Sequence, residues 1–336
     1  MITTYLRSSS INAHEMCEQS YFLSYVLGLE SNPHKKTEQG TICHKVFECL
    51  ALESAAKQKG ETSYIDENLG CFDVGTEPER LLHLAYDYYT GKSVNEFEES
   101  HREECLAWVK KALAYNDGEV DPRNRKIVAA ETHFDFEIDR DWANYKFNYE
   151  GKELEGKLAI KGTIDLVTEV NENTLEVIDW KTGARKNWGT GEIKTYKKLQ
   201  DDIQLRMYHY ALSKLYPQYK TILVSIYFIN PFYHRETKTN VPAGLFTIAF
   251  SKHDLKTFED RLRVKFQQIR ESQRPHLNTS WKCKSFCHFG KTKYPGSNLT
   301  ICEHIRRKTE SLGIESTVEN FKNPNHKIDK YKPPGD

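Results

Sequence analysis

Two carboxylates and a lysine follow apolar, strand-like segments near the middle of this 336-residue chain. Asp165 belongs to GTIDLVTEV, and Asp179 and Lys181 belong to VIDWKTG. Side chains alternate between the two faces of a strand, so Asp179 and Lys181 should share one face while Trp180 points to the other. A tight antiparallel connection between the two segments would place Asp165 beside Asp179. This pattern predicts a chemical site at the end of an otherwise buried hairpin.

Paired carboxylates with a lysine suit the hydrolysis of phosphodiesters. Two carboxylates at short distance repel each other unless a cation lies between them, and hard divalent ions such as Mg²⁺ prefer oxygen ligands. The lysine could then orient an attacking water or neutralise the charge that builds on a phosphate. The same residue types also occur on surface hairpins that do no chemistry, so the rest of the chain must decide between the two interpretations.

The surrounding segments predict an α/β protein. Alternation with a period of two residues indicates strands in KIVAAETHFDFEI, EGKLAIKGTIDLVTEV, TLEVIDWK, ILVSIYFIN and GLFTIAF. Apolar residues at helical spacing indicate helices in the first 30 residues, in TEQGTICHKVFECLALESAAK, over 78–116 with a break near TGKS, over 196–216 and over 252–272. We expect a loop over the acidic segment 60–77.

Four motifs resemble the PD-(D/E)xK nuclease superfamily, in particular its RecB-like branch. GTID and IDWKTG, with 13 residues between their aspartates, resemble the two acidic motifs. GTICHKVFE resembles the helix with a metal-binding histidine, which would be His44, and QLRMY resembles the Gln-x-x-x-Tyr motif, which would be Gln204 and Tyr208. The match runs from roughly residue 8 to residue 305. It implies a restriction-endonuclease-like mixed central sheet flanked by helices, with a helical N-terminal part and a small cysteine-rich C-terminal appendage.

The resemblance also implies roles for these residues. Lys181 would position the water that attacks the phosphorus, and Gln204 and Tyr208 would contact the DNA strand or brace the lysine. Glu131 lies where related nucleases often have an acidic residue, and we interpret it as a supporting position outside the ligand set. The groups that would hold Mg²⁺ or Mn²⁺ are His44, Asp165, Asp179 and the backbone carbonyl of Trp180.

Helix residues beside these motifs have a simpler interpretation. Without the aspartates, His44 would be an ordinary helix histidine, and Gln204 and Tyr208 would be a half-exposed helix face. Four neighbours at helical spacing fit a buried stripe, namely Leu199, Ile203, Met207 and Ala211.

Charge is balanced overall but uneven along the chain. The formal net charge is zero, with 48 basic and 48 acidic residues. Residues 61–105 have 12 acidic and three basic side chains, 181–220 have nine basic and three acidic, and 282–308 have seven basic and one acidic. Basic clusters can attract a polyanion while the whole chain stays neutral. The residues we expect to contact the DNA backbone are Lys181, Arg185, Lys186, Lys194, Lys197 and Lys198.

One cysteine near the start of the chain and three near its end could share a metal site, and three alternatives for them stay open. The resemblance to AddB-type subunits and CRISPR adaptation nucleases implies a [4Fe–4S] cluster, although 14 residues separate the last two ligands here, unlike the family's tighter grouping. The implied ligands are Cys17, Cys283, Cys287 and Cys302. A zinc site from the three late cysteines with His288 or His304 is the alternative, and four free thiols is another. The other four cysteines, Cys43, Cys49, Cys71 and Cys105, read as plain helix or loop residues.

The division of the chain that we expect has four consecutive parts. A helical part with Cys17 and His44 covers 1–120, the nuclease core covers 121–275, a metal-cluster appendage covers 276–305, and a polar, flexible tail covers 306–336. FGKTK is not a P-loop, because the position that needs glycine is Ser285. Any helicase activity would therefore come from a separate helicase or recombination protein.

These observations predict a DNA exonuclease that acts on single-stranded or free ends. The alternatives are a catalytically silent DNA-binding or assembly subunit of a recombination or repair complex, and a structure-specific endonuclease with a zinc site. The intact Asp-Asp-Lys set favours an enzyme, and no segment reads as a target-recognition region. MITTYLRSSS lacks the layout of a signal peptide and no apolar run reaches membrane length, so we expect a cytoplasmic protein with no membrane partner.

Overall fold

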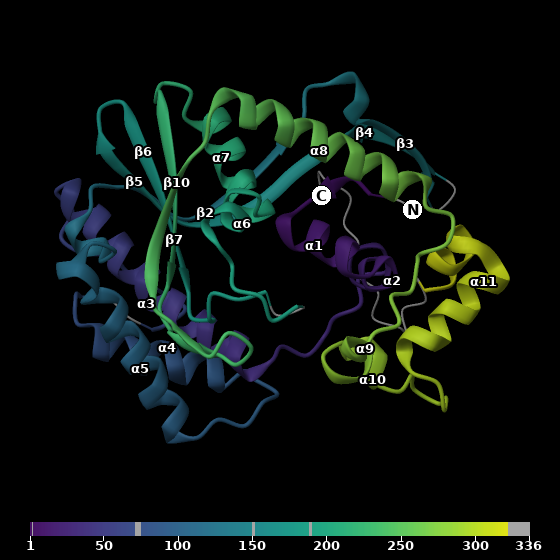
Figure 1. Cartoon of the computed structure of the whole chain (residues 1–336), viewed down its shortest axis with the longest axis horizontal. Helices are drawn as coiled ribbons and strands as arrows, with labels where there is room; N and C mark the ends of the chain where they lie inside the picture. Colours follow the sequence, from purple (N-terminus) through teal and green to yellow (C-terminus); the bar gives the residue numbers. More distant parts are fainter. Residues whose placement is uncertain (2, 71–74, 150–151, 188–189, 322–336) are drawn as a thin grey trace. The chain divides into compact units, whose positions relative to one another are not determined.

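The computed structural model describes residues 1, 3–70, 75–149, 152–187 and 190–321 (Figure 1). These residues form two compact units, each assembled from separated parts of the chain. Unit 1 contains residues 1–32, 134–162 and the chain from 256 onward, and unit 2 contains 33–133 and 163–255. Cys17 and His44 therefore belong to different units, although they lie in one N-terminal part of the division expected from the sequence. No helix among these residues is both long and apolar enough to cross a bilayer.

A mixed sheet forms the centre of unit 2. Antiparallel pairing joins β5 (Ala159–Asn171) to β6 (Thr174–Lys181) through a tight turn, β6 runs parallel to β7 (Thr221–Phe228), and β10 (Gly244–Ala249) runs antiparallel to β7. β2 (Ile127–Glu137) pairs with β5 on the other side. The structure thus confirms the mixed central sheet and the central hairpin.

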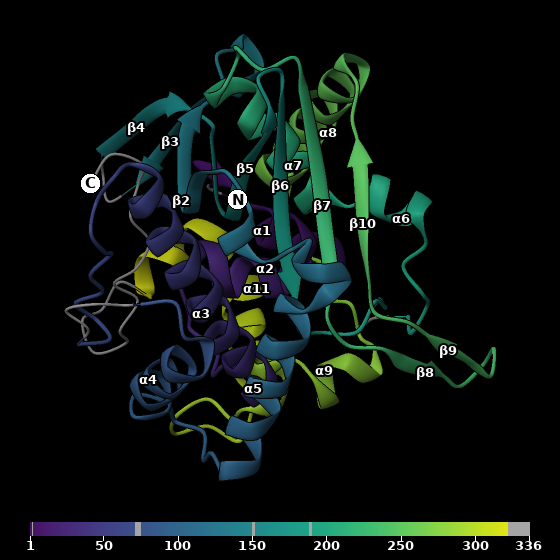
Figure 2. The same ribbon diagram turned by 90° about the vertical axis from the view of Figure 1, so that its left-hand side faces the viewer.

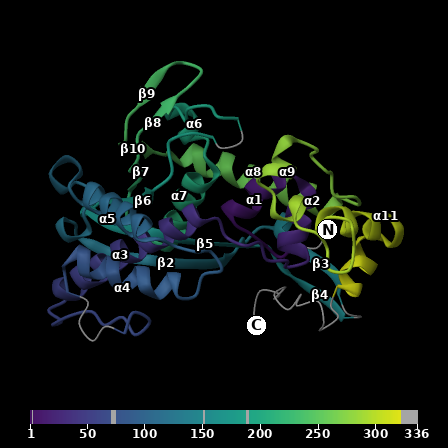
Figure 3. The same ribbon diagram turned by 90° about the horizontal axis from the view of Figure 1, so that it is seen from below.

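Helices cover both faces of this sheet (Figures 1 and 3). On one face lie α3 (Lys35–Gln58), α4 (Pro78–Thr90) and α5 (Glu99–Leu113), as expected from their apolar spacing. Their buried residues form one core with the sheet, in which the rings of Phe47 and Trp180 stack at 4.8 Å. Burial of two aromatic side chains at this contact fixes α3 against β6.

The opposite face of the sheet is covered by α6 (Tyr196–Gln200) and α7 (Ile203–Leu215). The sequence predicts one helix over 196–216, but the structure divides it because the Asp202 side chain accepts a hydrogen bond from the Gln204 backbone N–H and starts a new helix. Three short 3₁₀ helices, η2 (Tyr115–Gly118), η3 (Pro122–Asn124) and η4 (Asp141–Ala143), connect longer elements. The predicted buried stripe is confirmed, since Leu199, Ile203, Met207 and Ala211 are all buried.

A hairpin follows β7 that the sequence analysis did not predict. Its strands are β8 (Phe232–His234) and β9 (Thr239–Val241), which pair antiparallel. Figure 2 shows the hairpin extending beyond the end of β7 and β10. Each strand has only three residues, too few for an alternating pattern to be visible in the sequence.

Unit 1 brings the two ends of the chain together. Its first segment forms β1 (Tyr5–Leu6), α1 (Ser8–Met16), α2 (Glu18–Tyr21) and the π-helix η1 (Phe22–Val26). The prediction of a single first helix is wrong, because Cys17 is extended (φ −167°) and separates α1 from α2. β1 runs parallel to the start of β5, and β3 (Asn144–Tyr149) pairs with β4 (Lys152–Lys157).

The C-terminal part of the chain is more ordered than its composition suggested. After α8 (Lys252–Glu271) come α9 (Trp281–Ser285), α10 (His288–Lys291) and α11 (Ile301–Asn320). Residues 306–320, expected as part of a flexible tail, instead form most of α11, which starts with a capping box between Thr300 and Glu303. The remainder of the expected tail, 322–336, lies outside the described residues, as does Cys71.

Acid should destabilise unit 2 through His209 of α7. This side chain is 6% exposed and its ring packs 5.1 Å from that of Phe250. Burial lowers its pKa to about 4, whereas the unfolded chain has the ordinary value near 6.5. The stabilising contribution is complete above pH 6.5 and is lost as pH falls toward 4, by up to about 3 kcal/mol. Urea unfolding from pH 7.5 to 5 should show this loss for the wild type but not for His209→Gln, and parallel profiles would contradict it.

Candidate active site

The hairpin of β5 and β6 places the two aspartates at one end of the sheet. Leu166 pairs with Ile178, so the neighbouring residues Asp165 and Asp179 meet across the two strands. The backbone N–H of Trp180 donates a hydrogen bond to Asp165 Oδ2 at 3.1 Å. The Trp180 side chain enters the core on the α3 face, as the alternation of faces predicts.

A second group of ligand-type side chains gathers around Asp165. His44 Nδ1, from α3, lies 3.3 Å from Asp165 Oδ2. Glu131, from β2, completes a set of three residues whose ligand atoms all lie within 4.8 Å of one another. His44 and Asp165 were both predicted as metal ligands, whereas Asp179 is not a member of this group of three side chains. The Trp180 carbonyl stays a prediction.

Glu131 is the residue that the sequence analysis undervalued. Its backbone has φ 43°, in the left-handed region that a non-glycine residue seldom adopts, at a cost on the order of 1–3 kcal/mol. Burial, reinforced by the charge of Asp165, raises the pKa of Glu131 to about 7. A single acidic residue among small residues in VAAETHF was the available signal, but its conformation could not be inferred from the sequence.

Lys181 and α7 hold Asp179 from the other side. Lys181 Nζ lies 2.7 Å from Asp179 Oδ2, and Asp179 is fully buried while the Lys181 side chain is 31% exposed. Tyr208 donates its hydroxyl hydrogen to Asp179 Oδ1 at 3.2 Å, and Gln204 Nε2 lies 3.3 Å from the same oxygen and 2.6 Å from the Tyr208 hydroxyl. The predicted helix face thus points at the carboxylate rather than at the lysine.

The site has more carboxylates than positively charged side chains. Asp165, Asp179 and Glu131 face His44 and Lys181. Burial and, to a smaller extent, the charge of Asp165 raise the pKa of Asp179 to about 6 despite the Lys181 ammonium. Burial alone would lower the pKa of His44, but the Asp165 carboxylate outweighs it and raises the value to about 9. At neutral pH Asp179 is therefore mostly ionised and Glu131 is close to half protonated, and a bound cation would favour the ionised form of both.

This donor set fits a divalent metal ion. An imidazole nitrogen and two carboxylates converge, and Mg²⁺ and Mn²⁺ accept such oxygen-rich sets. His44, Glu131 and Asp165 are the residues that would hold the ion.

The predicted DNA-binding lysines and arginine follow β6 in unit 2. Arg185 lies over the Phe246 ring at 4.4 Å, and Lys186 Nζ lies 5.7 Å from the centre of the Phe232 ring. Two members of the set are neutralised within the chain, since Lys194 pairs with Asp202 and Lys198 pairs with Glu192. Lys197 is exposed.

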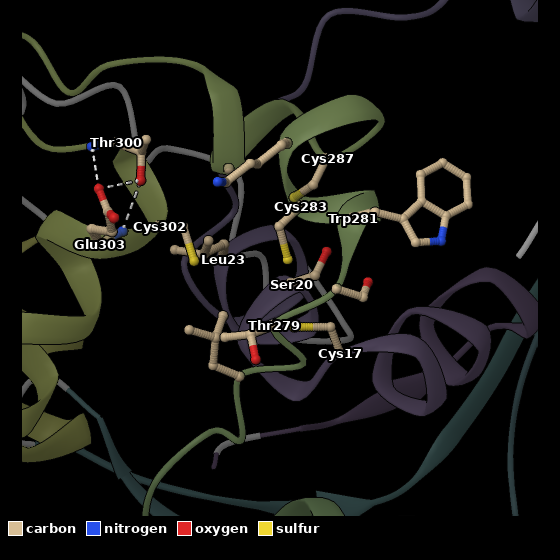
Figure 4. Close-up of a pocket in the computed structure, with 14 residues that line it drawn as sticks. Cys17, Ser20, Leu23, Thr279, Trp281, Cys283, Cys287, Thr300, Cys302 and Glu303 are labelled. Carbon is tan, nitrogen blue, oxygen red and sulfur yellow. Dashed lines mark hydrogen bonds between the residues drawn. The ribbon is translucent and has the colours of Figure 1, made fainter.

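Four cysteines line one cavity of unit 1, of about 560 Å³. Figure 4 shows their side chains around this space, while the indole ring of Trp281 points away from it. They are the four predicted ligands, Cys17, Cys283, Cys287 and Cys302. Burial and, to a smaller extent, the three neighbouring thiols raise the pKa of Cys302 to about 12. The structure therefore brings together residues that are up to 285 positions apart in the chain.

These thiols do not form a closed zinc site among the described residues. Tetrahedral zinc, with Zn–S bonds of about 2.3 Å, holds its sulfur atoms roughly 3.8 Å apart. Among the described residues, no three ligand atoms drawn from these cysteines, His288 and His304 lie within 4.8 Å of one another. The His304 ring also stacks on Tyr294 at 3.8 Å. The described residues therefore hold no closed zinc site at this place.

The other described cysteines lie in the core of unit 2, as expected for plain helix residues. Cys43, Cys49 and Cys105 are fully buried. The Cys43 thiol faces the carbonyl of Cys105, and the Cys49 thiol faces Asp66. None of the three lines the cavity of unit 1.

The chain matches a known family of nucleases. The family model of the PD-(D/E)XK nuclease superfamily matches residues 8–291. Among solved structures, the chain is similar to a candidate exonuclease from Eubacterium rectale, with a TM-score of 0.48 and 9% identity over 88% of this chain and 91% of that one. It is also similar to SSO0001, with a TM-score of 0.26 and 14% identity over 83% and 92% of the two chains. No curated protein shows a significant match.

Metal binding should depend on Glu131. Glu131→Gln keeps the shape of the side chain but removes one charged oxygen ligand, so the affinity for Mn²⁺ should fall roughly tenfold or more. His44→Ala should have an effect of the same direction. Gln204→Ala is the matched control, because Gln204 contacts Asp179 and not the group of three. Calorimetric titration with Mn²⁺ measures all three variants, and wild-type affinity in Glu131→Gln would remove this residue from the site.

Proposed function

Because the chain belongs to the PD-(D/E)XK nuclease superfamily, we propose that it is a metal-dependent nuclease that hydrolyses DNA phosphodiester bonds at the end of β6. One observation carries the proposal: the group of His44, Glu131 and Asp165 lies around the same hairpin end as the Asp179–Lys181 ion pair. A site with ligands for a cation and a partly exposed lysine offers both kinds of positive charge that a phosphate requires.

A Mg²⁺ or Mn²⁺ ion bound by the group of three would polarise a phosphoryl oxygen and lower the pKa of a bound water. Lys181 contributes the second positive charge. Burial would lower its pKa, but Asp179 and Asp165 outweigh that effect and raise it, so the amine stays protonated at neutral pH. A protonated lysine cannot accept a proton, so its role is to orient the attacking water and stabilise charge on the phosphate.

Gln204 and Tyr208 act as positioning residues in this proposal. Both contact Asp179 Oδ1, and Tyr208 is 4% exposed, so its hydroxyl is directed at the carboxylate and away from solvent. Their hydrogen bonds fix the orientation of Asp179 and, through it, that of Lys181. The alternative that they contact the DNA strand directly fits this burial less well.

The substrate that we propose is DNA with a single-stranded or free end, cut as an exonuclease. Exposed basic residues beyond Lys181 would bind the backbone without reading sequence, which makes binding salt-dependent. Unwinding would need a separate helicase or recombination protein. FGKTK does not supply a nucleotide-binding loop for this purpose. Its first three residues belong to α10, and Gly290 packs so closely that a Cβ there would lie 2.3 Å from the Cys283 carbonyl oxygen.

We also propose a [4Fe–4S] cluster at the four cysteines of unit 1. The cavity that all four cysteines line together supports this proposal, since one bound group could reach each of them. A cluster held by Cys17 and by three late cysteines would link α2 to α9–α11 by coordination bonds, which should stabilise the fold.

Cleavage should require Lys181. Lys181→Ala removes the protonated amine beside the reacting phosphate, and the loss of one preorganised charge should lower the rate at least a hundredfold. Lys220→Ala is the matched control, because Lys220 precedes Thr221, which pairs with Thr174 at the opposite end of β6. The assay uses end-labelled single- and double-stranded DNA with Mn²⁺ or with EDTA. Similar rates for Lys181→Ala and the wild type, at equal DNA binding, would refute the assignment.

The cysteine cluster should give the protein a colour. Protein purified without oxygen should be brown, with broad absorption near ~400 nm from charge transfer to iron. Cys17→Ser should lose that absorption and unfold at a lower temperature, while Cys49→Ser, a thiol of unit 2, should keep the absorption.

Two results would contradict the cluster. Colourless protein with one equivalent of zinc would replace iron–sulfur with zinc at these cysteines. Colourless, metal-free protein in which Cys17→Ser is as stable as the wild type would leave four free thiols. Neither result bears on the nuclease site, which lies in unit 2.

A further inference from the structure

The hairpin of β8 and β9 starts at the same end of the sheet as Lys181. Lys181 pairs with Phe228, the last residue of β7, and the Lys181 carbonyl accepts a hydrogen bond from the Ile229 N–H at 3.0 Å. Asn230 Nδ2 then donates to the Thr182 carbonyl at 2.8 Å. Tyr233 follows Phe228 by five residues, a chain length of at most roughly 18 Å. The hairpin thus starts at the end of β6, within this chain length of Lys181.

One face of the hairpin is packed and the other is exposed. Phe232 and His234 on β8 face inward with Val241 on β9, and Lys186 lies over the Phe232 ring. Tyr233 points to the other face and is 56% exposed, and Asn240 lies directly across from it. An exposed aromatic ring beside an amide is an unusual use of surface, because burial of such a ring normally stabilises a fold.

The turn of the hairpin is ordered by its own hydrogen bonds. His234 Nδ1 accepts the Thr237 backbone N–H at 3.2 Å and lies 2.8 Å from the Thr237 hydroxyl. Lys238 adopts φ 52°, which closes the turn. Arg235 and Lys238 are exposed there, and neither pairs with a carboxylate of the described residues. The β8–β9 hairpin, called the arm below, is therefore ordered, and an ordered segment loses little conformational freedom when it binds a ligand.

Charge around the arm favours a polyanion. Residues 182–198 and 230–241 together contain seven basic and two acidic side chains, and two of the basic ones, Lys194 and Lys198, pair with carboxylates. A basic surface with an exposed aromatic ring is the combination that binds single-stranded nucleic acid, since each base offers a face for stacking and each phosphate a negative charge. A protein partner would be expected to cover a larger apolar surface than one tyrosine ring.

We propose that the β8–β9 hairpin binds the single strand that enters the active site, with Tyr233 stacked on one base and with Arg235 and Lys238 on the backbone. This inference rests on the proposed nuclease function and adds to it a preference for unpaired DNA. Stacking requires that the base is not paired in a duplex, so the arm selects single strands next to the site of cleavage. It reads no particular base, because every base has an aromatic face.

Binding of a fluorescent single-stranded oligonucleotide tests the proposal. The measurement uses the full chain with Lys181→Ala, so that the probe is not cut. Adding Tyr233→Leu should weaken binding roughly five- to hundredfold, since it keeps apolar area but loses the ring. Tyr233→Phe is the matched control and should bind like tyrosine, because stacking does not need the hydroxyl. Tyr233→Leu binding as tightly as Tyr233→Phe would overturn the proposal and leave the arm to a protein partner.

An oligonucleotide series separates stacking from charge. We expect one position along the probe at which an abasic nucleotide weakens binding to the protein with Tyr233. With the abasic nucleotide at that position, Tyr233→Leu should cause no further loss of affinity. Arg235→Gln should bind with the same abasic pattern as the parent, but with the slope of log affinity against log salt reduced by about 0.7. A uniform response to every abasic position would overturn the stacking contact.

The outcome is independent of the nuclease test. If the wild type cleaves DNA but Tyr233→Leu binds single strands as tightly as its parent, only the proposed role of the hairpin is wrong. If the wild type cleaves no nucleic acid with Mn²⁺, the proposed function fails, and the binding comparison still reports on the arm. A wild type that binds no single strand overturns the arm as well.

Discussion

Repulsion between buried carboxylates is the constraint on which the nuclease unit depends. The antiparallel pairing of β5 with β6 brings Asp165 and Asp179 to one end of the sheet, where little water can screen them. Each is then held by a different cationic side chain, His44 for the first and Lys181 for the second. These two contacts draw α3 and the end of β6 to the same point. The position of the elements and the charge of the site are therefore two results of one requirement.

Side chains alone do not complete this neutralisation. Three carboxylates meet two cationic side chains, His44 and Lys181, and burial raises the pKa of Glu131 and Asp179. The unit tolerates this because its large core, with Phe47 stacked on Trp180, stabilises the same hairpin. A strained backbone at Glu131 is a further cost at the same place. Functional sites often combine such costs, and a divalent cation would relieve the electrostatic part.

Local patterns predicted the strands, the helices and the shared faces, whereas the resemblance to a nuclease superfamily implied the mixed central sheet and the role of His44. Alternation of faces put Asp179 and Lys181 together, and spacing by four residues put Gln204 and Tyr208 on one helix face. Features that depend on tertiary structure were not predictable. Glu131 reaches the site through an uncommon backbone angle, Cys17 interrupts a stretch with helical spacing, and the strands of the β8–β9 hairpin are too short to show a period.

The central claim is that His44, Glu131 and Asp165 hold a divalent cation beside Lys181. Diffraction from crystals soaked in Mn²⁺, recorded for anomalous scattering, tests it most directly. The account predicts one strong peak within about 2.5 Å of a side-chain ligand atom of each of the three residues, which is the range of metal–ligand distances for ions of this kind. No peak at this place in well-soaked crystals, or an ion bound only by residues elsewhere in the chain, would contradict it.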